Sequence, residues 1–195
     1  RIPQIAVRRM KIGREVERLT HVTQSYLSLA RMPHPELAVT DLGRVARDAV
    51  DFHRPVAEAE HVTLECTVQD GLPAIRADAA QVRQVLANLL RNALEAVSGR
   101  PERVVRVEVR EERGGIELSV RDTGPGIPDD ARPRLFEPFF TTKSEGTGIG
   151  LAGSQQIAVA HQGTLTFDAG GPGACFRLWL PGPPTDLPSQ SPGGK

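Results

Sequence analysis

One segment of this sequence carries amide side chains where ordinary helices avoid them. Between residues 78 and 97, polar side chains recur every three or four positions and so share one face of the expected helix; they are Gln81, Gln84, Asn88, Asn92 and Glu95. Asparagine is unfavourable in the middle of a helix. Two asparagines one turn apart are therefore either part of a solvated face or a pair of neutral oxygen ligands. Such oxygens suit a magnesium ion that also binds phosphate and keeps several waters.

A second candidate group is a carboxylate at the end of an apolar strand. Asp122 follows Val120-Arg121 and enters the loop Thr123-Gly124-Pro125-Gly126-Ile127. At the rim of a pocket this side chain can accept a hydrogen bond from an exocyclic amine such as that of adenine. A tight turn, in which aspartate and glycine serve only the local backbone, is the structural alternative.

A third candidate is the glycine-rich stretch Gly146-Thr147-Gly148-Ile149-Gly150-Leu151, which opens a helix expected over residues 151–161. Alternate glycines let backbone amides approach a polyphosphate, and the helix N-terminus adds partial positive charge. Lys143, just before it, can place a point charge on a phosphate. The spacing matches neither a P-loop nor a dinucleotide-binding turn. A flexible linker is the alternative for the glycines alone.

Between the two glycine loops lies the apolar stretch Leu135 to Phe140. An apolar plug inside a mobile segment is what a lid needs in order to dock. The same plug can equally be an anchor in the core.

The elements that must position these residues follow from hydrophobic periodicity and capping signals. In order, they are a helix from Asp41, a strand over 62–68, a helix over 78–97, strands over 105–109 and 116–120, a helix over 151–161, and strands over 164–167 and 175–180. Residues 112–115 are expected to form the turn between the strands at 105–109 and 116–120. Because this order does not alternate strand and helix, the prediction is an α+β fold with a mixed sheet and its helices on one face.

The N-terminal part is predicted to be a separate helix. Its seam advances by four and three residues and consists of Ile12, Val16, Leu19, Thr23, Tyr26 and Ala30. Such a seam packs lengthwise on a partner helix, which the sequence does not obviously supply. The end of the chain, from Pro181, is rich in Pro, Gly and Ser and is predicted to be disordered.

Composition excludes several classes of protein. The chain has 195 residues, and its 24 basic and 24 acidic residues leave a formal net charge of zero. That balance argues against bulk electrostatic binding to nucleic acid or to an anionic membrane. Two cysteines, Cys66 and Cys175, exclude a disulfide scaffold and suit a reducing cytosol. No apolar run approaches the roughly 20 residues that span a bilayer.

Taken in order, the candidate segments resemble the conserved boxes of sensor histidine kinases. Asn88 to Glu95 resembles the N box, Asp122 to Gly126 the G1 box, Phe136 to Phe140 the F box and Gly146 to Leu151 the G2 box. Gly171 to Phe176 resembles a later glycine segment of the same family. This resemblance covers about residues 41–181 and implies an α/β-sandwich ATP-binding domain of the histidine kinase and gyrase type, with a lid between the G1 and G2 boxes.

The resemblance also implies roles for individual residues. Asn88 and Asn92 would hold Mg²⁺ through their side-chain oxygens, and Asp122 would recognise adenine. The expected ATP-binding set is Asn88, Asn92, Asp122, Gly124, Gly126, Ile127, Lys143, Thr147, Gly148, Ile149, Gly150 and Leu151. The expected cofactors are ATP and Mg²⁺.

The front segment resembles the second helix of the family's dimerisation and phosphoacceptor hairpin, in kinases of the nitrogen-regulation type. We therefore expect part of that hairpin at 1–37, the catalytic domain at 38–181 and a disordered tail at 182–195. No histidine of the chain has the acid and proline context of the family's phosphoacceptor; the five are His21, His34, His53, His61 and His161. The acceptor is expected upstream of this fragment.

The implied function is transfer of the γ-phosphoryl group of ATP to that histidine, followed by relay to an aspartate on a response regulator receiver domain. A cytoplasmic homodimer formed through the hairpin is expected, with no nucleic acid and no direct membrane contact by this fragment. Three alternatives remain: a conformational ATPase resembling gyrase, a serine kinase of the anti-sigma type, and a nucleotide-sensing or scaffold module without catalysis. The first uses a glutamate one helical turn before the second asparagine, where this chain has Asn88.

Overall fold

The computed structural model of the chain describes residues 34–143 and 146–182. The helix expected over residues 12–30 and the tail expected beyond residue 182 lie outside the described residues. No helix in the described part of the chain combines the length and the apolar character that crossing a bilayer would require.

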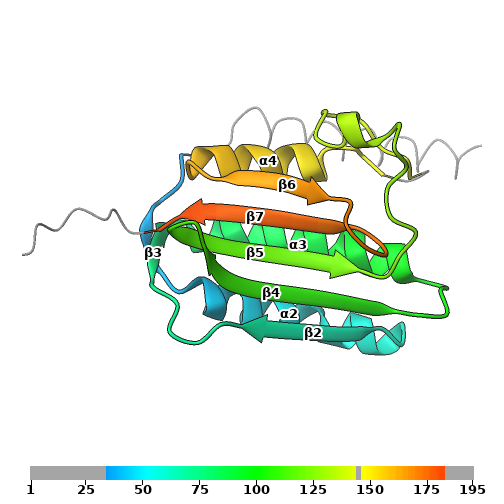
Figure 1. Ribbon diagram of the computed structural model, residues 1–195, viewed down its shortest axis with the longest axis horizontal. Coiled ribbons are helices and arrows are strands. Elements are labelled where there is room, and N and C mark those ends of the chain that lie inside the picture. The colour runs from blue at the N-terminus through cyan, green and yellow to red at the C-terminus, as the bar shows by residue number, and fades with distance from the viewer. Residues whose placement is uncertain (1–33, 144–145, 183–195) are drawn as a thin grey trace, which may run out of the picture.

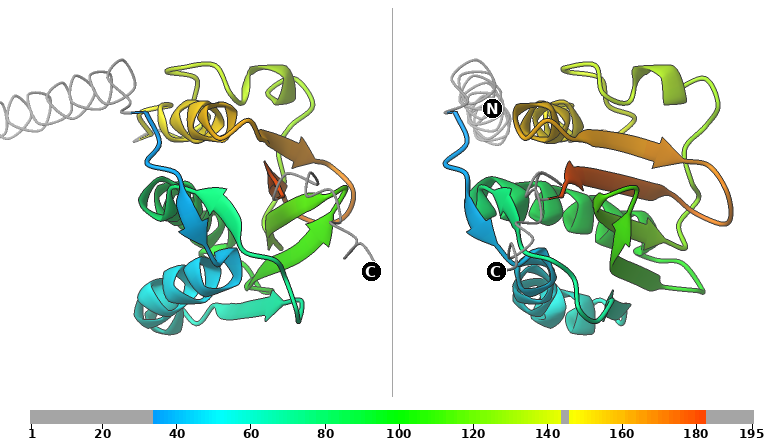
Figure 2. Two further views of the ribbon diagram at one scale, coloured as in Figure 1. Left: turned by 90° about the vertical axis from the view of Figure 1, so that its left-hand side faces the viewer. Right: turned by 60° about the vertical axis from the view of Figure 1, so that its left-hand side comes forward.

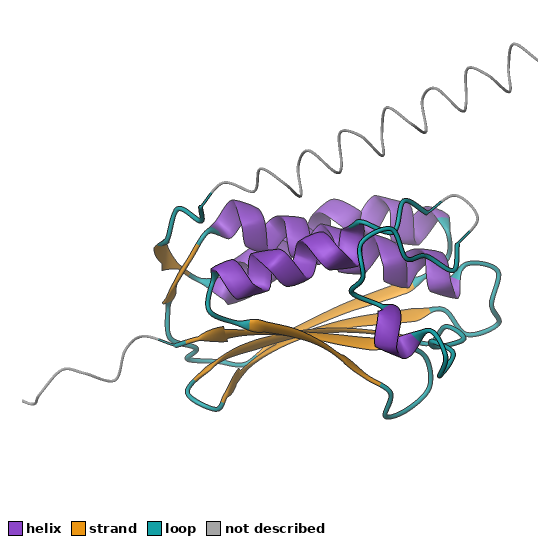
Figure 3. Ribbon diagram, turned by 90° about the horizontal axis from the view of Figure 1, so that it is seen from above, coloured by secondary structure: helices purple, strands orange, loops and turns teal. Residues whose placement is uncertain are grey.

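The fold is a sheet of five strands with three helices packed on one of its faces (Figures 1 and 3). The strand order is β2-β4-β5-β7-β6. These strands are β2 (Thr63–Val68), β4 (Val104–Glu112), β5 (Gly115–Asp122), β6 (Thr164–Asp168) and β7 (Cys175–Pro181). The helices are α2 (Leu42–Ala59), α3 (Ala79–Val97) and α4 (Gly150–Ala160). Two views from the side show the helices together on one face of the sheet (Figure 2).

The sheet is mixed, as predicted. β2 pairs with β4 in parallel, whereas β4 with β5, β5 with β7, and β6 with β7 pair antiparallel. Apolar residues of β4, β5 and β7 alternate toward the helices and are buried there, including Val107, Leu118 and Leu178. The α+β class and the placement of the helices on one face are thus confirmed.

The central helix α3 is specified by its cap and by its apolar stripe. The Asp78 carboxylate accepts hydrogen bonds from the Ala80 and Gln81 amides, as an N-cap residue should. The apolar face is buried against the sheet and the other helices; it consists of Val82, Val85, Leu86, Leu89, Leu90, Ala93, Leu94 and Val97. This burial fixes the rotation of α3 and therefore the direction of its polar face.

Some local predictions were wrong. The turn expected over residues 112–115 is shorter, because Glu112 and Gly115 pair in the sheet and only Arg113 and Gly114 connect the strands. Both connecting residues have positive φ, 51° and 70°, which matches the twist of a two-residue hairpin. Helix α4 begins at Gly150 rather than Leu151.

Three short elements were not predicted. β1 (Ala38–Thr40) pairs antiparallel with β3 (Ile75–Ala77), and a 3₁₀ helix, η1, spans Arg132–Arg134. Elements of three residues give too few positions for periodicity to be recognised.

Candidate functional site

The candidate residues gather at one end of the sandwich, where β5 ends, α3 ends and α4 begins (Figure 1). Contacts join the three segments. The Asn88 amide on α3 donates to the hydroxyl of Ser154 on α4 at 3.1 Å. The loop after β5 touches the last turn of α3, because a Cβ on Gly124 would lie 2.9 Å from Ala96 Cβ. Segments far apart in the sequence therefore form one site.

Asp122 is the most buried charged residue of the site, with 4% of its surface exposed. Its Oδ1 accepts hydrogen bonds from the amides of Gly124 at 2.8 Å and Ala174 at 3.2 Å. Within the described residues, no group donates to its Oδ2. Burial raises the pKa of the Asp122 carboxyl, and the two amide hydrogen bonds oppose that rise. The arrangement orients one oxygen and leaves the other as an acceptor.

The backbone around Asp122 is packed too tightly for side chains. Gly173 has φ +76°, and a Cβ there would lie 1.8 Å from the Asp122 carbonyl oxygen. Gly126 has φ +71°, and its Cβ would lie 3.0 Å from the Gly173 carbonyl oxygen. The two glycine segments that follow β5 and precede β7 therefore pack directly on each other around the carboxylate.

Asn88 is tied to the start of α4. Besides the bond from its amide to Ser154, the Ser154 hydroxyl donates to the Gly150 carbonyl at 2.9 Å. A Cβ on Gly150 would lie 2.2 Å from Asn88 Oδ1, so only glycine allows this approach. Within the described residues, no donor binds Asn88 Oδ1, which leaves that oxygen as a candidate ligand.

Asn92 already has a cation at its side-chain oxygen. Lys143 Nζ donates to Asn92 Oδ1 at 3.1 Å and to the Glu95 carboxylate. Among residues 34–143 and 146–182, no three His, Cys, Asp or Glu side chains form a group that could hold a metal. The oxygens of Asn88 and Asn92 fit a magnesium ion that takes its remaining ligands from phosphate and water.

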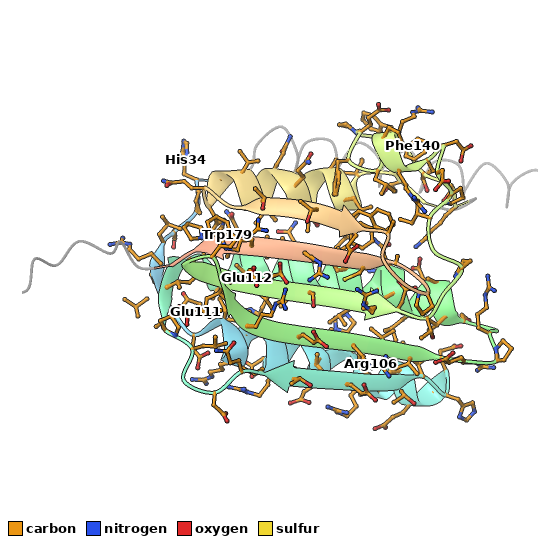
Figure 4. All side chains as sticks on the ribbon, viewed as in Figure 1. His34, Arg106, Glu111, Glu112, Phe140 and Trp179 are labelled. Carbon is orange, nitrogen blue, oxygen red and sulfur yellow. The ribbon has the colours of Figure 1, made fainter. Side chains whose placement is uncertain are left out.

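The apolar stretch between the glycine loops divides into an anchor and an exposed part. Leu135 is buried and Phe136 packs against the core, whereas Phe139 is 50% exposed. The Phe139 amide donates to the Gly148 carbonyl at 2.9 Å, which joins this stretch to the second glycine loop. The Arg134 guanidinium lies 4.4 Å from the centre of the Phe140 ring, labelled in Figure 4.

The remaining predicted residues lie around this arrangement. Ile149 is buried, while Ile127 and Leu151 are partly buried against the core and Thr147 is half-buried. The polar face of α3 is not uniform, because Gln81 is buried and Gln84 is exposed.

Sequence reasoning missed two participants in the site, Ser154 and Ala174. Ser154 follows Gly150 by one helical turn, a spacing that places its hydroxyl near the start of α4. Ala174 acts through its backbone amide, and no side-chain pattern signals that. The glycines before Ala174 were the available sign that its backbone approaches another segment.

A family profile described as histidine kinase-, DNA gyrase B- and HSP90-like ATPase matches residues 77–184. The chain belongs to this ATPase family. Sensor histidine kinase ZraS of Escherichia coli O157:H7 is 37% identical over 171 residues, which are 87% of this chain and 37% of the relative. The chain thus spans well under half the length of that relative, and over the shared part it is a sensor histidine kinase catalytic domain.

Solved histidine kinases have the same fold. The catalytic domain of histidine kinase ThkA matches with a TM-score of 0.69 at 26% identity, over 75% of this chain and 96% of that chain. ThkA in complex with the response regulator protein TrrA matches with a TM-score of 0.73 at 22% identity, over 89% of this chain and 50% of that chain. Full-length ShkA in complex with AMPPNP matches with a TM-score of 0.71 at 29% identity, over 83% of this chain and 35% of that chain.

Proposed function

We propose that this chain binds ATP with magnesium and supplies the catalytic core of a protein-histidine kinase. The observation that supports it best is the Asp122 carboxylate, which is buried and held by two backbone amides while its Oδ2 has no donor within the described residues. An acceptor oriented in this way recognises a donor such as the exocyclic amine of adenine. The ATP-binding residues are those named from the sequence, with the phosphates on the side of Gly146 to Leu151.

Asn88 and Asn92 are proposed to hold the magnesium ion through their side-chain oxygens. Bound there, the ion would neutralise charge on the ATP phosphates during transfer. Asn88 is held for this role by Ser154, which accepts from its amide and leaves the side-chain oxygen beside Gly150 at the start of α4. Lys143 would exchange its contact with Asn92 for a phosphate oxygen.

The residues present favour phosphoryl transfer over hydrolysis. A neutral imidazole needs little activation to attack the γ-phosphorus, so the catalytic domain has mainly to position ATP and stabilise charge. Activation of water would need a general base, and Asn88 stands one turn before Asn92, where a carboxylate would be required. The amide cannot accept the proton.

We propose that this chain is part of a longer kinase, since it spans 37% of the length of its ZraS relative. The acceptor histidine would lie on a hairpin of which residues 1–37 form part, ahead of a catalytic domain at 38–181 and a tail at 182–195. The phosphohistidine would pass its group to an aspartate of a response regulator, as the ThkA complex with TrrA suggests by analogy. The kinase would be a cytoplasmic homodimer joined through the hairpin.

The experiment that tests the proposal supplies the missing acceptor. The chain is incubated with magnesium, γ-labelled ATP and a separate helical hairpin carrying the acceptor histidine of a ZraS-type relative. We expect label on the hairpin that is labile to acid and stable to alkali, as phosphohistidine is. ATP binding without transfer would support the nucleotide-sensing alternative, and rapid release of inorganic phosphate would support the ATPase alternative.

Glu95 offers a test of the lysine's role. Changing Glu95→Gln removes the carboxylate that binds Lys143 and one negative charge near the proposed phosphates. The pair is exposed, with 44% and 51% of the two side chains accessible. Exposed ion pairs contribute at most about 1 kcal/mol. We therefore expect ATP to bind about twofold to fivefold more tightly in calorimetric titration.

The matched control is Glu108→Gln, which removes the same charge from an exposed position on β4. Glu108 has no ion pair among the described residues. Equal gains in the two variants would show that the change in net charge, rather than release of Lys143, is responsible.

A further inference from the structure

The Asp122 carboxylate, which we propose faces the nucleotide, contacts the turn between β6 and β7. β7 is the strand next to β5 in the sheet. Ala174 ends the turn between β6 and β7, and its amide donates to Asp122 Oδ1 at 3.2 Å. In the same place, the Asp122 amide donates to the Ala174 carbonyl at 2.9 Å. Together with the Gly124 amide, the turn therefore sets the position of Asp122 Oδ1.

Little in the turn itself fixes its path. Residues 169–172 are exposed, and Gly171 and Gly173 have φ of +115° and +76°. Glycine loses more conformational freedom on folding than any other residue, so a glycine-rich turn needs outside contacts to stay in one conformation.

Those contacts come from Asp168 and Arg121. Asp168 Oδ1 accepts from the Gly170 amide at 2.8 Å, and Arg121 Nη1 donates to the Gly170 carbonyl at 2.9 Å. Both backbone polar groups of Gly170 are therefore bound by side chains, one at the end of β6 and one on β5. Arg121 is also the chain neighbour of Asp122, which couples the turn and the carboxylate through β5.

Arg177 completes the cluster. Its Nη2 donates to Asp168 Oδ2 at 2.7 Å, and its Nη1 donates to Glu117 at 2.8 Å. Arg121 Nη2 lies 3.6 Å from the same Asp168 oxygen. The hydrogen bond from Arg177 and the Gly170 amide lower the pKa of the Asp168 carboxyl, so Asp168 binds these groups as a carboxylate. The cluster spans β5, β6 and β7 on the sheet face without helices.

We propose that the cluster of Asp168, Arg121 and Arg177 positions the β6–β7 turn so that the Ala174 amide orients Asp122 for the nucleotide base. This inference rests on the proposed ATP site. It assigns the three residues as positioning residues, since they act through Ala174 and Asp122.

The first test compares ATP affinities. Asp168→Ala removes both the Gly170 contact and the partner of the two arginines, and we expect ATP to bind about fivefold to tenfold more weakly. Asp168→Asn keeps an acceptor for Gly170 and should lose less. The control is Asp51→Ala, which also removes an aspartate and breaks the 3.1 Å ion pair with Arg54 on α2, the helix that contacts β2 at the opposite edge of the sheet from β6. Affinity equal to that of the control would overturn the inference.

A second measurement needs no nucleotide. In Asp168→Ala, hydrogen exchange at the amides of Asp122 and Ala174 should become about tenfold faster, while amides in the middle of α3 keep their rates. Unchanged exchange at those two amides would overturn the inference even if affinity fell. If the wild-type chain failed to bind ATP while exchange responded as expected, the positioning would stand and the proposed function would fall.

Discussion

The Asp122→Asn variant is expected to lose ATP binding by about two orders of magnitude while keeping its fold. Asparagine keeps an oxygen that accepts from the Gly124 and Ala174 amides, so the local backbone retains its hydrogen bonds. The other oxygen becomes an NH₂ group, which would face the amine of adenine donor to donor. A hydrogen bond to a charged group is worth about 1.5–3 kcal/mol, and each 1.4 kcal/mol is about tenfold in affinity. Calorimetric titration with ATP and magnesium on both proteins measures the loss.

The pH dependence of ATP binding by the wild-type protein tests the same carboxylate. Burial raises the pKa of Asp122 above its ordinary value, and a proton on the carboxyl would occupy the oxygen that accepts the amine. ATP affinity should therefore fall as the pH decreases through that raised pKa. The decline should begin at a higher pH than for an exposed aspartate. If the folded Asp122→Asn variant bound ATP with full affinity, the adenine base would not contact Asp122.

Gly173→Ala is expected to have the largest effect on stability, about 2–4 kcal/mol in the free energy of unfolding. Alanine at φ +76° is strained, and its Cβ would lie 1.8 Å from a backbone oxygen that cannot rotate away. The turn must move, and the Ala174 amide would move with it, so ATP affinity should fall as well. Urea denaturation and titration with ATP measure the two effects.

Gly99→Ala is the control that separates the cost of a positive φ from the cost of a steric clash. Gly99 has φ +71°, and no atom lies within 4 Å of the position of its Cβ. This variant therefore has the conformational cost without the contact, and we expect a loss of about 1 kcal/mol with ATP affinity unchanged. Similar losses in both variants would mean that the close approach at Gly173 relaxes at little cost.

The longer helices and strands could be predicted because each repeats its pattern of apolar and polar residues several times. Helix α3 shows its apolar stripe from Val82 to Val97 and begins directly after the capping aspartate, Asp78. β4 and β5 alternate apolar and polar residues over 105–109 and 116–120. Asn88, Asn92 and Asp122 were recognisable because their types conflict with the helix or strand around them, which points to chemistry rather than packing.

The contacts between segments could not be predicted in the same way. Whether Lys143 binds Glu95 and Asn92 depends on where a loop of the chain lies over α3, 48 and 51 residues away in sequence. The bond from Ala174 to Asp122 uses a backbone group, which carries no residue-specific signal. The types of individual residues were informative in the sequence, but the residues that they contact could be identified only from the three-dimensional structure.

The pairing of β5 with β7 has a consequence for how the domain folds. β4 and β5 are joined by two residues and can pair early, but the contact from Asp122 to Ala174 closes a loop of 52 residues that includes most of the backbone proposed to bind ATP. The entropy of such a closure grows only as the logarithm of loop length, and doubling the loop would add about 0.6 kcal/mol. Evolution can therefore lengthen or shorten this region at small thermodynamic cost, provided that the residues at its two ends still meet.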